Sequence, residues 1–264
     1  MKKNLSFYIL SALVCLLLIA ALAAPILAPN DPNETNLLAA QQGFSSEFPL
    51  GTDGLGRCML SRMLYGARVS IFTSLLITMI VFTIGTTVGI LCGYFGGAVD
   101  TVLNELITIM QAFPQIVLAI AIAGLLGIGI KNLIIALCLV QWVDYARLAR
   151  SFTYSMRNRT FLKAARICGE SHLSIIFRRV FPNVMPPLII NASLGIASMI
   201  MQIAALSYLG IGVAEPTAEW GAMINLGRNY MQTDIKMIMI PGTAIFITSA
   251  LFNLFGEKLR DRLK

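Results

Sequence analysis

Long apolar stretches that do not alternate with polar residues constrain the fold of this 264-residue chain more than any other feature. Inside a membrane, a backbone can satisfy its hydrogen bonds only in helices or in a closed barrel, and unalternating stretches favour helices. The sequence therefore predicts an all-α integral membrane protein with six transmembrane helices. The expected spans lie near residues 7–28, 71–95, 113–130, 132–149, 184–210 and 236–256.

Composition supports a membrane protein and argues against a nucleic-acid partner. Apolar residues make up 57% of the chain and charged residues 12%, against about 45–50% and about 25% in soluble domains. The net charge of +7 does not indicate nucleic-acid binding, because the cations lie between apolar stretches and form no basic domain with interleaved aromatic residues. The expected partner is the lipid bilayer.

The N-terminal region, residues 1–70, is expected to contain one span, an external loop and an interfacial helix. The first apolar stretch, Phe7 to Ala28, follows two lysines and resembles a signal peptide. Its length of roughly 22 residues exceeds a usual h-region and suffices to cross a hydrocarbon core of about 30 Å, so we interpret it as an uncleaved span. After a loop rich in Pro, Asn and Gly, residues 58–69 place Arg62 and Arg68 opposite Met and Leu, which predicts a short interfacial helix.

The distribution of Lys and Arg predicts the orientation. Residues 71–258 are expected to form the transmembrane core and residues 259–264 a tail. If both termini are cytoplasmic, 14 of the 20 Lys and Arg residues lie in cytoplasmic segments, as the positive-inside rule requires. The loop between the fourth and fifth spans is then cytoplasmic as well.

Small and polar residues inside the expected spans indicate close packing and a candidate path. Gly85, Gly89 and Gly93 recur every four residues, so a neighbouring helix can approach that face closely. Polar side chains in membranes usually face a bundle interior or water, although hydrogen bonds between helices account for many of them. For Glu105, a position at the cytoplasmic edge of the membrane is an equally open alternative. The candidates for lining a translocation path are Glu105, Asn191 and Gln202.

The cytoplasmic loop contains the most informative stretch, FLKAARICGESHLSIIFRRVFPN at residues 161–183. Its first part predicts a short helix that ends at Gly169, and Ser171 is a suitable N-cap for a second helix. The first helix is too small to stabilise itself in water, so its small, mostly neutral face is expected to fit a groove on another protein. That face comprises Phe161, Ala164, Ala165 and Cys168.

Enzymatic and metal-binding motifs are absent from the sequence. It contains no HExxH or GxSxG pattern, and the glycine-rich string GLLGIGIKN lacks the spacing of a phosphate loop. The five cysteines are scattered without CxxC spacing, and most of the 13 methionines lie in spans, where packing is their commoner role. His172 is the single histidine, so it lacks the partner ligands that a metal ion needs. The sequence therefore predicts no resident metal site and no catalytic activity.

The cytoplasmic loop resembles the EAA loop of binding-protein-dependent ABC importer permeases. The resemblance rests on Ala164 and Ala165, Gly169 four residues later, and the segment from Ile175 to Pro182. It departs at Lys163, where the family has its acidic residue, and at Cys58, where an Asp is usual. Further segments are similar to the C-type subunit of the dipeptide, oligopeptide and nickel group: residues 49–70, 112–114, 145–151, 182–187, 207–213 and 216–224.

This resemblance implies a type I ABC importer permease fold with a coupling loop at about residues 150–182. It implies a heterodimer with a homologous B-type permease, two ATPase subunits that hold ATP and Mg²⁺, and an extracytoplasmic substrate-binding protein. It also implies a multi-pass protein of a bacterial or archaeal plasma membrane that binds no cofactor itself. The residues expected to contact an ATPase are Phe161, Lys163, Ala164, Ala165, Cys168 and Gly169.

The cargo is less closely defined by the sequence. The segments PTAEWG (216–221) and YARLARS (145–151) resemble nickel and metallophore permeases, which favours nickel or a metal chelate. A di- or oligopeptide importer is the alternative. An ion channel or a secondary transporter would also fit a polytopic chain, but neither needs a docking loop.

Overall fold

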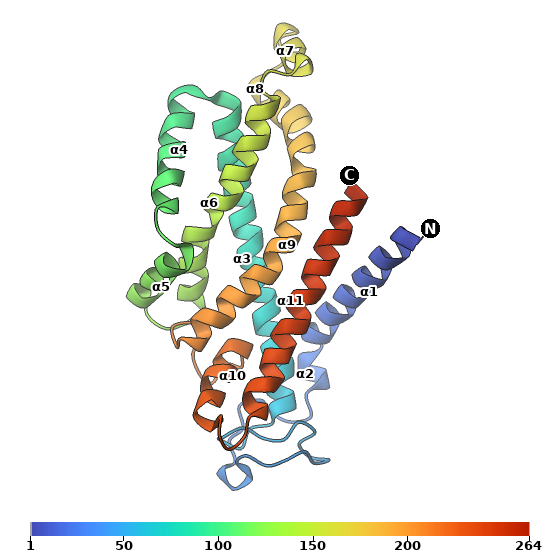
Figure 1. Cartoon of the computed structure of the whole chain (residues 1–264), viewed down its shortest axis with the longest axis vertical. Coiled ribbons are helices and arrows are strands. Elements are labelled where there is room, and N and C mark those ends of the chain that lie inside the picture. The colour runs from blue at the N-terminus through green and yellow to red at the C-terminus, as the bar shows by residue number, and fades with distance from the viewer. Residues whose placement is uncertain (1, 264) are drawn as a thin grey trace.

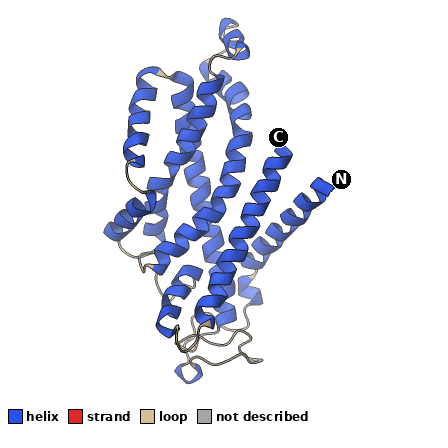
Figure 2. Ribbon diagram, viewed as in Figure 1, coloured by secondary structure: helices blue, strands red, loops and turns tan. Residues whose placement is uncertain are grey.

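The structure, a computed structural model, describes residues 2–263, with side chains from Leu5 onward. Within these residues the chain is helical and forms no strand, as the blue ribbons of Figure 2 show. The helices long and apolar enough to span a membrane are α1 (Lys2–Leu22), α3 (Met59–Phe95), α6 (Ile130–Met156), the continuous α8–α9 unit (His172–Tyr208) and α11 (Lys236–Leu263). A bent pair, α4 (Gly97–Gln111) and α5 (Gln115–Leu126), makes a sixth span if it counts as one, which agrees with the predicted number.

The long helices form one bundle with different structures at its two ends (Figure 1). At one end lies α7 (Thr160–Ile167), and both chain termini point toward that end. At the other end lie α2 (Ala24–Leu27), α10 (Trp220–Gly227) and the loop of residues 28–58. We call this loop, together with residues 209–219, the cap. Two 3-10 turns, η1 (Leu37–Ala39) and η3 (Arg228–Tyr230), also belong to this end.

The centre of the bundle is the contact between α3 and α6, which depends on glycine. A Cβ added at Gly85 would lie 2.7 Å from the Cβ of Tyr145, and one at Gly89 would lie 2.7 Å from the Cβ of Ala149. Both distances are shorter than side chains tolerate, so α6 packs directly on the glycine face of α3. The predicted close approach at this repeat is confirmed, and the neighbouring helix is α6.

Three predicted boundaries differ from the structure. Residues 58–69 do not form a separate interfacial helix but continue into the span as the first turns of α3, because Arg62 is ion-paired in the interior and does not face water. The predicted span 113–130 is only the second arm of the α4–α5 pair, bent by 85°, and α4 was not predicted. The fifth span, predicted near 184–210, begins earlier, because Pro182 lies in the first turn of α9 and a π-helical turn, η2 (Ile176–Val180), joins α9 to α8.

Candidate functional site

The loop predicted to dock on a partner forms α7, which projects from the end of the bundle (Figure 1). The helix ends in a Schellman motif, in which the Glu170 N–H donates to the Ala165 carbonyl and the Gly169 N–H to the Arg166 carbonyl, both at 3.1 Å. Gly169 has a φ of +76°, in the left-handed region that glycine tolerates best. The predicted helix end at Gly169 is therefore confirmed.

Two side chains hold α7 against the bundle. Leu162 is 1% exposed and Ala165 is 4% exposed, and both pack in an apolar cluster with Ile175 and Val180 of the α8–α9 unit. Because Leu162 has more apolar surface to bury than any alanine, it decides which way the helix turns, and Ala165 is turned inward with it. The face predicted for docking is thus only partly free. The remaining predicted contact residues are exposed: Phe161, Lys163, Ala164, Cys168 and Gly169.

Polar contacts connect α7 to the ends of α3 and α8. The Arg166 guanidinium lies over the ring of Tyr94, 5.2 Å from its centroid, and the Tyr94 hydroxyl is 2.9 Å from Nδ1 of His172. The Ser174 N–H donates to Oγ of Ser171 at 3.3 Å, so the predicted N-cap is confirmed. The single histidine therefore joins two helices at their ends.

Glu170 stabilises the turn between α7 and α8. Its carboxylate accepts a hydrogen bond from the Ser174 hydroxyl at 2.7 Å and one from Nε of Arg179 at 2.9 Å. The hydrogen bond from Ser174, followed by the hydrogen bond and charge of Arg179, lowers the pKa of Glu170 below its ordinary value.

Large apolar side chains remain exposed around this end of the bundle. Ile167 on α7 is 86% exposed, Leu173 is 68% exposed and Phe177 is 66% exposed. We call these three residues, together with Phe161, the α7 patch. Exposed apolar side chains at one end of a fold are candidates for a contact surface.

A polar cavity of about 490 Å³ lies on the side of α6 that faces α9. Within it, the Asp144 carboxylate accepts hydrogen bonds from Nε2 of Gln115 at 2.8 Å and from Nε2 of Gln111 at 3.4 Å. The oxygen of the Gln111 side chain accepts in turn from Nη1 of Arg147 at 3.4 Å. The bent α4–α5 pair brings both glutamines to α6. The cavity is lined by Asp144, Arg147, Leu148, Ser151 and Asn191.

The structure separates the three residues predicted to line a path. Asn191 lines the cavity. Gln202, further along α9 toward the cap, accepts a hydrogen bond from the side chain of Gln141. Glu105 lies exposed on α4 and does not line the cavity. The prediction did not include Asp144, although a carboxylate within the predicted span 132–149 was a signal for it.

Four charged side chains form a network inside the cap. Arg57 pairs with Asp53 at 2.7 Å and with Glu215 at 2.6 Å, and Arg62 pairs with the same two carboxylates at 3.7 and 3.3 Å. Both arginine side chains are at most 2% exposed. Burial opposes the charge of Arg57, but the hydrogen bonds and charges of Glu215 and Asp53 outweigh it and hold its pKa above the ordinary value. The network was missed in the sequence because Glu215, which pairs with both arginines, lies 158 positions beyond Arg57 and 153 beyond Arg62.

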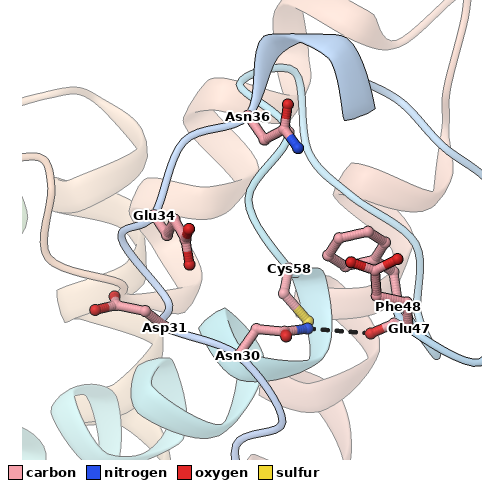
Figure 3. A pocket seen from close by; sticks show the side chains of 8 residues that line it. Asn30, Asp31, Glu34, Asn36, Glu47, Phe48 and Cys58 are labelled. Carbon is pink, nitrogen blue, oxygen red and sulfur yellow. Dashed lines mark hydrogen bonds between the residues drawn. The ribbon is translucent and has the colours of Figure 1, made fainter.

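A small pocket of about 90 Å³ also lies in the cap (Figure 3). Asp31 and Glu34 lie on one side of it and Glu47 beside Phe48 on the other, and Nδ2 of Asn30 donates to the Glu47 carbonyl at 3.0 Å. The carboxylates do not converge on one point. Among residues 2–263, no group of three or more His, Cys, Asp or Glu side chains could hold a metal ion.

The α7 loop and the polar cavity lie on a fold that known proteins share. Residues 85–264 match the model of a family described as "Binding-protein-dependent transport system inner membrane component". The chain belongs to this family. Over 99% of its length it is 36% identical to the dipeptide transport system permease protein DppC of Haemophilus influenzae, covering 91% of that protein. Over 95% of its length it is 37% identical to the nickel transport system permease protein NikC of Escherichia coli, covering 91% of that protein.

Solved structures agree with this assignment at the level of fold. The chain is similar to a chain of the inward-facing MetNI methionine ABC transporter, with a TM-score of 0.64 and 16% identity over 78% of this chain and 98% of that one. The chain is therefore an ABC importer permease with the type I fold, and it belongs to the C-type peptide and nickel group. Members of this family are multi-pass inner-membrane subunits, generally non-catalytic, that work with ATPase subunits and a substrate-binding protein.

Proposed function

We propose that this permease forms one half of a transmembrane pore, paired with a homologous B-type permease, and that α7 couples it to two ATPase subunits in the cytoplasm. In this proposal the cap is extracytoplasmic and both termini are cytoplasmic. The positive-inside count from the sequence supports that orientation. ATP and Mg²⁺ are held by the ATPase subunits, and this chain contributes no cofactor.

The observation that carries the coupling role is the α7 patch. A helix of eight residues buries too little to be stable alone, yet α7 is attached to the bundle by the buried Leu162 and ends in the Schellman turn at Gly169. Its free side keeps Ile167 in water at 86% exposure. A partner that covers this side gains the buried apolar area, and its movements reach α8 and α9 through the cluster around Leu162.

The cavity on α6 supports a role for this face in translocation. Asp144 and Arg147 lie on one side of α6, a helix long and apolar enough to span a membrane. Charged side chains in spans usually face a bundle interior or a water-filled path. A B-type permease packed over this side would enclose the path between the two subunits.

Two cargo candidates follow from the relatives and from the residues of the cavity. NikC, to which the chain is 37% identical, is named for nickel transport. The segments 145–151 and 216–221 also favour nickel or a metallophore complex. DppC, to which the chain is 36% identical, is named for dipeptide transport. The cavity carries one carboxylate, Asp144, and one guanidinium, Arg147. Because a bare dication would be attracted by the first and repelled by the second, we propose that the cargo is a small polar organic molecule, either a peptide or a metal held in an organic chelate.

Replacing Ile167 with Asp tests the coupling role. In proteoliposomes that contain the permease pair, the ATPases and the loaded binding protein, I167D should reduce ATP-driven uptake at least tenfold, because a charge on the α7 patch opposes burial against an ATPase. The matched control is L38D. Leu38 is 96% exposed but lies in the cap, so this variant should retain uptake. Normal uptake by I167D, with the variant inserted in the membrane, would refute docking through α7.

A further inference from the structure

The carboxylate of Asp144 lies within a membrane span without an opposite charge. Asp144 is near the middle of α6 and only partly buried. Its hydrogen-bond donors are the neutral amides of Gln111 and Gln115, and no salt bridge joins it to a cation within the described residues. A carboxylate in a span is costly and is usually kept for function. This side chain therefore has capacity for a cationic group that enters the cavity.

Arg147 lies three residues further along α6, on the same side of the helix. It is exposed, and it makes one long hydrogen bond, at 3.4 Å to the side-chain oxygen of Gln111. A guanidinium has five N–H donors in a planar fork that matches a carboxylate. Most of its donors are therefore free to bind an anionic group.

The side-chain amide of Gln111 lies between these two charged groups and forms a hydrogen bond with each. Its amide nitrogen donates to Asp144 and its amide oxygen accepts from Arg147. With this bridge the carboxylate and the guanidinium border one cavity without forming an ion pair. Ser151 and Asn191 line the same cavity and offer neutral hydrogen-bonding groups.

We propose that this cavity is a binding site for a small zwitterion, in which Asp144 binds a free ammonium group and Arg147 binds a free carboxylate. Ser151 and Asn191 offer hydrogen bonds to neutral polar groups of the bound molecule. An unblocked dipeptide has this arrangement of groups. The inference rests on the proposed transport function and narrows its cargo to molecules that carry both charges.

Other roles for the two charges predict different ligands or different burial. A bare divalent cation would meet the charge of Arg147 in the same cavity, and a purely anionic chelate would use Arg147 but not Asp144. A role only in helix packing would bury and pair both side chains, whereas Arg147 is exposed and Asp144 is partly exposed.

Equilibrium binding of labelled alanylalanine to the complete transporter in nanodiscs tests the proposal, with the binding protein left out so that it imposes no selection. Acetylation of the dipeptide amino group and amidation of its carboxylate should each weaken binding at least tenfold in the wild type. Asp144→Asn should weaken binding of free alanylalanine at least tenfold and remove the effect of acetylation. Arg147→Gln should do the same for amidation. Glu105→Gln is the matched control, a carboxylate on α4 outside the cavity, and should bind as the wild type does.

The blocked dipeptides keep the test decisive even if a variant does not fold. Equal binding of free and blocked dipeptides by the wild type, absence of alanylalanine binding, or unchanged binding by both cavity variants would each overturn the zwitterion site. ATP-driven uptake of the natural cargo by the wild type is measured in parallel. If uptake occurs without the predicted binding pattern, only this inference fails, whereas absence of any ATP-driven uptake refutes the proposed function itself.

Discussion

Replacing Gly89 with alanine should separate α3 from α6 and destabilise the protein. The added Cβ would lie 2.7 Å from the Cβ of Ala149 and closer still to the Ala146 carbonyl oxygen, whereas ordinary contacts begin at 3.4 Å. The two helices must therefore move apart by more than about 0.7 Å. Forcing extra volume into a tight contact costs about 1–3 kcal/mol. Because α6 carries Asp144, the same movement should also lower uptake.

The free energy of unfolding of the detergent-solubilised chain, measured by titration with SDS, gives the magnitude. The matched control is Gly124→Ala in α5, where an added Cβ meets no atom within 4 Å and the change should be neutral or stabilising by up to about 1 kcal/mol. Combining Gly85→Ala with Gly89→Ala should cost less than the sum of the two, because one separation of the helices relieves both contacts. If Gly89→Ala is as stable as Gly124→Ala, the close approach of α3 and α6 does not exist.

Three further predictions concern the two ends of the bundle. Replacing Arg62, 1% exposed, with Met leaves its carboxylate partners with one cation fewer and should lower the free energy of unfolding by about 3–5 kcal/mol; a loss below about 1 kcal/mol in the same SDS titration would contradict the network. Leu162→Ala should weaken the attachment of α7 by about 2–5 kcal/mol and speed hydrogen exchange there, and unchanged exchange would show that Leu162 does not hold the helix. The lowered pKa of Glu170 means that its stabilising hydrogen bonds with Ser174 and Arg179 act fully above its ordinary value of 4.5 and are lost as the pH falls through the lowered value. Hydrogen exchange of residues 170–174 should accelerate over that acidic range in the wild type but not in Glu170→Gln, and identical pH profiles would refute the role of this carboxylate.

Features that depend on neighbouring residues were predictable from the sequence. The spans followed from apolar length. The end of α7 and the start of α8 followed from Gly169 and Ser171, because caps are formed by residues close along the chain. The glycine repeat of α3 also predicted a close helix contact, because periodicity alone places small residues on one face. It did not reveal that the partner is α6.

Features that depend on the fold were not predictable. The pattern placed Ala165 with the free face of α7, but the neighbouring Leu162 has the larger surface to bury and turns it inward. The pattern of residues 58–69 predicted that Arg62 lies at the membrane interface. The structure buries it instead, because it pairs with two carboxylates that lie outside this segment. A helix with Asp100 and Glu105 did not stand out as part of a span, and α4 is long and apolar enough for one only together with α5.

The same limit explains the candidate path. Glu105 and Asp144 are both carboxylates among apolar residues, and the sequence offers no reason to rank one above the other. The fold separates them, because the bend between α4 and α5 brings two glutamines to Asp144 and leaves Glu105 on the outer surface. Which intramembrane charge faces a cavity is therefore a property of helix arrangement.

The charge network of the cap also constrains the order in which the protein assembles during synthesis. Arg57 and its partner Glu215 are separated by 158 positions, so both arginines emerge from the ribosome long before that carboxylate. Until residue 215 has been delivered to the same side of the bilayer, Arg57 and Arg62 share Asp53 alone. The cap is thus completed when only α11 remains to be inserted, and in a nascent chain arrested before that point the two arginines of the cap network lack one of their two carboxylate partners.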